Sequence, residues 1–138
     1  MALDYGERRV GVAVTDATGL LAQPLETIRG ARRPELFARL LELVREYGVG
    51  TLVLGLPLHM DGGSGDQAAA TRRFGDEVEK RTGIAVHYLD ERWTSREAER
   101  VLGEAGSSRR RQRAKRERTD AVAAALILRT WLDREAPL

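Results

Sequence analysis

Three acidic residues stand where a folded chain could use them for chemistry. Asp4 interrupts the apolar start of the chain, Glu91 follows an apolar run, and Asp120 directly precedes another. A carboxylate inside a buried strand is costly unless another group compensates its charge, so Asp4 is the most informative of the three. The positions of the three acids favour a carboxylate cluster organised around Asp4.

If these three acids converge, the cluster needs a cation. Two carboxylates about 4 Å apart repel by roughly 4 kcal/mol at an effective dielectric near 20. The chain has no cysteine and only two histidines, His59 and His87, which argues against a thiolate or all-histidine metal site. Oxygen ligands favour Mg²⁺ or Mn²⁺, and two such ions can hold the attacking and leaving oxygens of a phosphoryl displacement.

Each acid also has a structural explanation when it is taken alone. Asp120 could be a helix cap, Asp61 a turn residue before two glycines, and Glu91 a surface partner of Arg92. The sequence leaves these alternatives open for each residue. The combination favours a site more than any single member does.

Composition limits the class of protein. With 138 residues, 42% of them hydrophobic, the chain is long enough for one core, and we expect a single domain spanning 1–138. The absence of cysteine gives no support to a secreted, disulfide-bonded fold. The start of the chain lacks a signal-peptide pattern, and no apolar run is long enough to cross a bilayer. We therefore expect a soluble cytoplasmic protein.

Positive charge is concentrated in one segment, 107–118. It carries seven of the 23 basic residues and one of the 21 acidic residues, which leaves a body of net charge −4. Such a patch favours a polyanionic partner such as nucleic acid, although a solvated, flexible loop would have the same composition. The residues expected to contact this partner are Arg109, Arg110, Arg111, Arg113 and Lys115.

Apolar periodicity predicts the order of the elements. Three early strands are followed by helix, strand, helix, strand and two helices, with a Gly-rich loop at 57–65. This order predicts an α/β fold whose mixed sheet has an antiparallel half and a parallel βαβ half. The expected strands are a hairpin pair within 2–16, followed by 24–28, 51–56 and 84–89, and the expected helices are 33–48, 64–83, 94–106 and 121–133.

Local signals place the ends of these helices. Gly48 is placed to end the first helix, and Ser64 with Gln67 resembles a capping box at the start of the second. Thr94 with Glu97 forms a similar pattern, and Thr119 or Asp120 would cap the last helix, which is apolar almost all round and should be deeply packed. Functional groups in such sheets gather at the carboxyl ends of the parallel strands.

Four motifs follow one another along the chain. They are Asp4-Tyr5-Gly6 with Arg9-Val10-Gly11-Val12-Ala13, Gly55-Leu56-Pro57-Leu58 with Met60-Asp61-Gly62, Asp90-Glu91-Arg92 with Thr94, and Asp120 with Ala123-Ala124 and Ile127-Leu128. In this order they resemble the YqgF/RuvX family, described as Holliday junction resolvase-like proteins or pre-16S rRNA nucleases. The resemblance covers nearly the whole chain, although only three residues precede Asp4 where family members usually carry more.

The resemblance implies an RNase H-like fold and a metal-dependent nuclease site, similar to those of bacterial junction resolvases. By position it implies that Asp4, Glu91 and Asp120 bind the metal ions, with Asp61 and Asp90 in supporting roles. It also implies that three polar neighbours contact phosphate or orient the acids, and these are Arg8, Arg92 and Thr94.

Three functions remain to be separated. The first is an endonuclease that uses Mg²⁺ or Mn²⁺ on branched DNA or precursor ribosomal RNA; symmetric cleavage of a junction would require two active sites and hence a homodimer. The second is a nucleic-acid-binding or ribosome-assembly factor with weak or no catalysis. The third is a nucleotide binder related to actin or sugar kinases, for which the chain is too short.

The sequence allows more than one role for three further side chains. Trp93 lies in a motif loop and could stack on an unpaired base, whereas Trp131 is expected in the core. His59 could assist proton transfer, but a lone loop histidine is more often only solvated.

Overall fold

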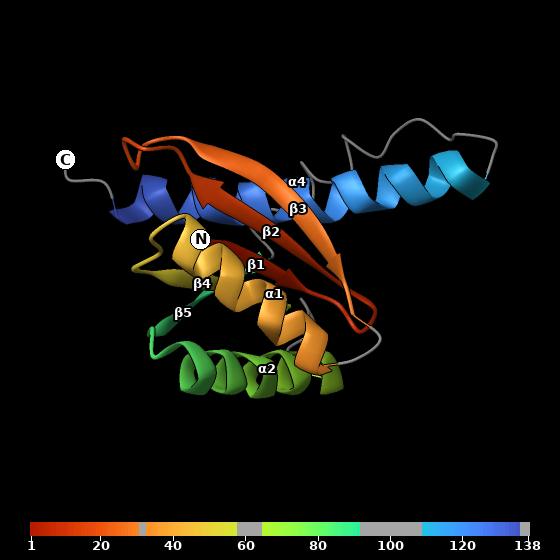
Figure 1. The fold of residues 1–138 in the computed structure, drawn as a ribbon, viewed down its shortest axis with the longest axis horizontal. Helices are drawn as coiled ribbons and strands as arrows, with labels where there is room; N and C mark the ends of the chain where they lie inside the picture. Colours follow the sequence, from red (N-terminus) through yellow and green to blue (C-terminus); the bar gives the residue numbers. More distant parts are fainter. Residues whose placement is uncertain (31–32, 58–64, 92–108, 136–138) are drawn as a thin grey trace.

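A five-stranded mixed sheet forms the centre of the computed structural model (Figure 1). The structure describes residues 1–30, 33–57, 65–91 and 109–135, with side chains from residue 119 onward in the last range. The strand order is β3-β2-β1-β4-β5; the first three strands pair antiparallel, and β4 pairs parallel with β1 and β5. The predicted mixed sheet is confirmed. The strands are β1 (Ala2–Tyr5), β2 (Arg9–Thr15), β3 (Ala22–Arg29), β4 (Leu52–Leu56) and β5 (Val86–Asp90).

Helices cover both faces of this sheet. Figure 1 shows α1 (Arg33–Glu46) and α2 (Asp66–Thr82) on one face and the long α4 (Arg109–Glu135) on the other. Gly48, with φ +59°, follows the end of α1 as predicted, and Gly83, with φ +72°, caps α2 by donating its N–H to Glu79 O. In the described part of the chain, no helix has both the length and the apolar character of a membrane span.

The period of two along each strand divides the core into two layers. Leu3, Leu52 and Leu54 face α1 and α2, together with the alternate valines of β2. Ala2, Ala13 and Val53 face α4, where they pack against Ala124, Ile127 and Leu128. The α4 face is therefore lined with small residues, which allow this helix to approach the sheet closely.

The prediction for the start of the last helix was wrong. The expected start was at Thr119 or Asp120, but α4 begins at Arg109, so the basic residues 109–118 have a helical backbone. Arginine, lysine, glutamine, glutamate and alanine all have high helix propensity, so the charge of this run does not interrupt the helix. Asp120 is consequently an internal residue of α4 and not its cap.

Two smaller expectations also need correction. Gly65 is the N-cap of α2 and no side chain caps this helix among the described residues, while the expected cap Ser64 lies outside them. Trp131 is partly buried at the edge of the α4 layer, with its ring centroid 4.9 Å from that of His87, and is not a fully buried core residue. The helix expected at 94–106 lies outside the described residues.

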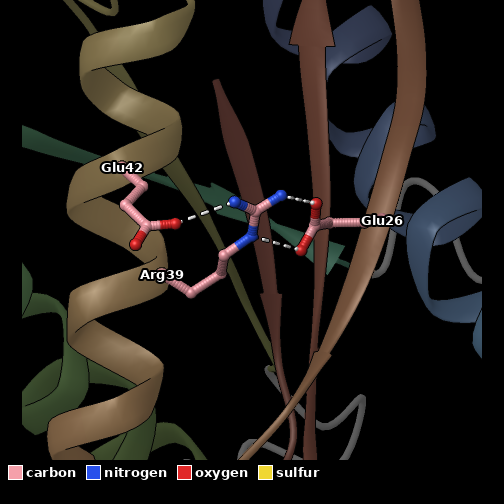
Figure 2. Close-up of polar contacts among 3 residues, drawn as sticks. All are labelled: Glu26, Arg39 and Glu42. Atoms are coloured by element: carbon pink, nitrogen blue, oxygen red, sulfur yellow. Dashed lines mark hydrogen bonds and ion pairs between the residues drawn. The ribbon is translucent and has the colours of Figure 1, made fainter.

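An ion-pair fork fixes α1 against the antiparallel half of the sheet. Figure 2 shows Arg39 donating to both carboxylate oxygens of Glu26 on β3, at 2.7 and 3.0 Å, and to Glu42 on its own helix at 2.9 Å. These hydrogen bonds raise the pKa of Arg39 above its ordinary value. Because the side chains are partly exposed, the fork specifies the orientation of α1 more than it adds stability.

Candidate active site

Asp4 occupies the middle strand of the sheet, on the face covered by α4. Alternation along β1 puts Asp4 on the same side as Ala2, which packs in the α4 layer. Its cross-strand partner on β2 is Gly11. Asp4, whose burial was expected to cost free energy, thus lies in a central strand that has another strand on either side.

Gly11 allows α4 to bring Asp120 beside Asp4. A β-carbon at Gly11 would overlap the main-chain carbonyl of Asp120, so the helix backbone lies directly on the glycine. No side chain could fit between this strand and the helix without moving one of them. Since Gly11 is the register partner of Asp4, the contact places residue 120 next to the buried acid.

Gly55 has the corresponding role on the other side of β1. A β-carbon at Gly55 would lie 2.5 Å from Glu91 Oε1 and 2.5 Å from Ile127 Cδ1. Leu89 is the register partner of Gly55 on β5, and Glu91 is two residues further along the same face. The missing side chain at Gly55 therefore makes space for the Glu91 carboxylate.

The electrostatics of Asp4 show that the three acids have come together. Burial, a hydrogen bond with Glu91 and the negative charges of Glu91 and Asp120 raise the pKa of Asp4 to about 9. Desolvation is the largest cause, and the hydrogen bond with Glu91 is next. Because its pKa is raised this far, the Asp4 carboxyl keeps its proton at neutral pH when no cation is bound.

Arg9 compensates the charge of the third acid. Its Nε lies 2.7 Å from Asp120 Oδ2, and both side chains are less than one third exposed. This ion pair links β2 to α4 at the edge of the carboxylate cluster. Sequence reasoning did not assign Arg9, Gly11 or Gly55 a role at the site, although all three fall within the motifs that carry the family resemblance.

A cavity of about 550 Å³ opens over this cluster. Asp4, Glu91 and Asp120 line it, together with residues 5–9 of the β1–β2 turn and Gln67 from the first turn of α2. The predicted phosphate contact Arg8 is exposed on this turn, which is closed by a 2.9 Å hydrogen bond from Gly6 N to Arg9 O. The cavity therefore combines an acidic floor with a basic rim.

The donor set fits a hard divalent cation. It consists of carboxylate oxygens alone, and repulsion from the negative charges of Glu91 and Asp120 contributes, after burial and the hydrogen bond with Glu91, to the raised pKa of Asp4. In the described part of the chain, no group of three acidic or histidine side chains already has the arrangement of a metal site. The Asp4–Glu91 hydrogen bond and the Arg9–Asp120 ion pair direct the carboxylates toward protein partners instead.

The structure describes some of the remaining predicted site residues only in part. Asp90 is the last residue of β5, and the backbone of residues 109–118 forms the first turns of α4. Ten residues that the sequence analysis singled out have side chains outside the described part of the chain. They are His59, Asp61, Arg92, Trp93, Thr94, Arg109, Arg110, Arg111, Arg113 and Lys115.

Comparison with solved structures identifies the class of fold. Two Thermus thermophilus RuvC structures, one of them in complex with a Holliday junction substrate, match with TM-scores of 0.57 and 0.52 at 16% and 14% sequence identity. Each match covers 96% of this chain and 91% or 92% of the other chain. The fold is therefore RNase H-like.

Sequence comparison identifies the family within this class. A model of RuvX, described as Holliday junction resolvase, matches residues 1–134. Proteins from Moorella thermoacetica and Roseiflexus, both named "Putative pre-16S rRNA nuclease", are 48% and 44% identical over 97% and 98% of this chain and 94% of their own lengths. The chain belongs to the RuvX family. The family description and the names of these relatives support nuclease activity.

Proposed function

We propose that this protein is a metal-dependent endonuclease that hydrolyses phosphodiester bonds in structured nucleic acid. The observation that carries the proposal is the convergence of three carboxylates around the middle strand of an RNase H-like sheet, beneath a cavity with arginines at its rim. A carboxylate floor holds cations, and guanidinium groups bind phosphate, so the two halves of the cavity suit a metal-assisted reaction on a polyanion.

Asp4, Glu91 and Asp120 would hold one or two Mg²⁺ or Mn²⁺ ions. When bound, these ions would lower the pKa of an attacking water and stabilise the charge that develops on the phosphoryl group. Gly11 and Gly55 position two of the three acids, while Arg8 and Arg9 stand where the phosphates of a bound strand would pass.

The names of the relatives mention precursor 16S rRNA, and the family description mentions the Holliday junction. We propose precursor ribosomal RNA or branched DNA as the substrate. On a two-fold symmetric junction, two copies of the chain would supply the two active sites that paired cleavage needs.

The test measures cleavage and binding separately on both substrates. Purified protein is incubated with a four-way DNA junction and with a precursor 16S rRNA end, over a titration of Mn²⁺ and Mg²⁺. We expect cleavage of at least one substrate that rises with metal and stops with a chelator. Tight binding that never yields products at any metal concentration would instead support a binding or ribosome-assembly factor.

A further inference from the structure

A second cavity adjoins the first across the β1–β2 turn. Its volume is about 260 Å³, and it shares Tyr5, Gly6, Glu7, Arg8 and Arg9 with the carboxylate cavity. Its other wall comes from Gly30 at the end of β3 and from the start of α1, where Arg33 and Leu36 line it. The turn therefore forms a ridge between an acidic cavity and a neighbouring one.

The second cavity has the chemistry of an anion site. Three arginines, Arg8, Arg9 and Arg33, line it against a single acid, Glu7, and since Arg9 is ion-paired with Asp120, the charges of Arg8 and Arg33 are the ones directed to an anion here. Guanidinium groups match phosphate geometry, and Arg33 also begins α1, where helix N–H groups favour negative charge. None of the three carboxylates of the first cavity lines this one, so an anion here would be spared their repulsion.

Arg33 is the charged residue that lines this cavity and not the first. Its side chain is 55% exposed, and Nη1 lies 3.0 Å from Glu77 Oε2 of α2. This ion pair engages one terminal nitrogen of a guanidinium group that carries five N–H donors. Arg33 can thus contact a phosphate in the cavity while Glu77 holds its other end in place.

We propose that this second cavity binds a backbone phosphate of the substrate strand on one side of the scissile bond. The inference rests on the proposed nuclease function, because it assumes that the strand enters the carboxylate cavity. The strand would then pass over the β1–β2 turn, beside Arg8 and Arg9, and place its next phosphates against Arg33.

A matched pair of variants separates this role from a structural one. Arg33→Gln removes both the phosphate contact and the link between α1 and α2, whereas Glu77→Gln breaks the same link but keeps the arginine. If Arg33 only joins the helices, both variants should behave alike. If it binds phosphate, only the arginine variant should lose affinity for nucleic acid.

The experiment measures binding of the four-way junction and of an RNA stem-loop by fluorescence anisotropy between 50 and 200 mM salt. The variants are made in the Asp4→Asn background, and melting temperatures confirm that they fold. We expect Arg33→Gln to reduce the slope of log affinity against log salt by about 0.7 to 0.9, and the salt-induced loss of affinity by about threefold, as for one lost phosphate contact. Glu77→Gln should leave the slope unchanged.

Two results would overturn the inference: an unchanged slope in Arg33→Gln, or equal losses in the two variants. Neither depends on cleavage. The proposed nuclease function fails separately, if the wild-type protein binds these substrates and never cuts them.

Discussion

Arg9 Nε on β2 lies 2.7 Å from Asp120 Oδ2 on α4, and this ion pair forms part of the wall of the carboxylate cavity. It provides positive charge beside an acid that we propose as a metal ligand. Asp4 and Glu91 meanwhile share a hydrogen bond. A divalent cation entering the cavity must therefore compete with a guanidinium group on one side and with a proton on the other.

This competition makes Arg9 a determinant of metal affinity. Replacing it by glutamine removes the competing charge, so Arg9→Gln should bind Mn²⁺ about tenfold more tightly, in line with roughly 1.5 kcal/mol for a charged contact. Calorimetry or the electron paramagnetic resonance of free Mn²⁺ measures this affinity without cleavage. Arg8→Gln removes the same charge from the exposed turn of the same cavity and serves as control. Weaker Mn²⁺ binding by Arg9→Gln would instead make Arg9 an orienting partner of Asp120.

The raised pKa of Asp4 predicts a pH-dependent gain in stability from its removal. An aspartate has a pKa near 3.9 when unfolded and about 9 here, so ionisation opposes folding, and stability falls as pH rises through this interval. Asp4→Asn should therefore melt at nearly the same temperature as the wild type below pH 4, and at an increasingly higher one up to about pH 9.

Thermal unfolding in a chelator checks this prediction, and saturating Mn²⁺ should reduce or reverse the difference by stabilising the wild type alone. If Asp4→Asn is less stable than the wild type at pH 8 without metal, the prediction is wrong. Other protein groups then compensate the negative charge of Asp4.

The two glycines beside β1 should respond differently to alanine. At Gly11 the new methyl group meets the main chain of Asp120, which can move only with α4, so Gly11→Ala should cost about 1 to 3 kcal/mol of folding stability. At Gly55 it meets the side chains of Glu91 and Ile127, and Glu91 can rotate away.

Gly55→Ala should therefore lower Mn²⁺ affinity and cleavage more than it lowers stability. Gly50, with nothing within 4 Å of its β-carbon position, is the control, and Gly50→Ala should be close to neutral. Denaturant unfolding and Mn²⁺ binding of the three variants check the pattern. Equal behaviour of Gly55→Ala and Gly50→Ala would contradict the role given to Gly55.

The basic start of α4 should make binding strongly salt-dependent. If about five of its charges contact duplex phosphates, affinity should fall roughly 500-fold between 50 and 200 mM salt. Neutralising the four arginines of this run should flatten that dependence, and an unchanged slope would remove the segment from the binding surface. The residues to replace together are Arg109, Arg110, Arg111 and Arg113.

The sheet could be predicted from the sequence because each strand is encoded by the residue types within its own few positions. The β-branched run of β2 and the continuous apolar run of β4 each predict a strand, and the structure confirms both as parts of one mixed sheet. Asp4 was recognisable because a carboxylate inside a strand is unusual. The sequence alone left open whether Glu91 and Asp120 come close to Asp4. In the structure both lie close enough to raise the pKa of Asp4.

The remaining features depend on distances that a sequence does not contain. The contact between Gly11 and the backbone of Asp120 follows from how closely α4 approaches β2, and this depends on small residues in several strands. The Arg9–Asp120 ion pair follows from the same approach. The start of α4 was misplaced because an arginine-rich run was assigned to a loop by its charge, although its helix propensity is high.

Cleavage by Asp4→Asn, compared with that by Asp133→Asn, tests the central claim most directly. Asp133 is an exposed acid near the end of α4, so its variant makes the same chemical change away from the cavity. Both are assayed with Mn²⁺ on the substrate that the wild type cuts, after anisotropy has confirmed binding. We predict that Asp4→Asn loses at least about 100-fold in rate, the equivalent of roughly 3 kcal/mol, while Asp133→Asn keeps the wild-type rate. Metal-dependent cleavage by Asp4→Asn at the rate of Asp133→Asn would contradict the account.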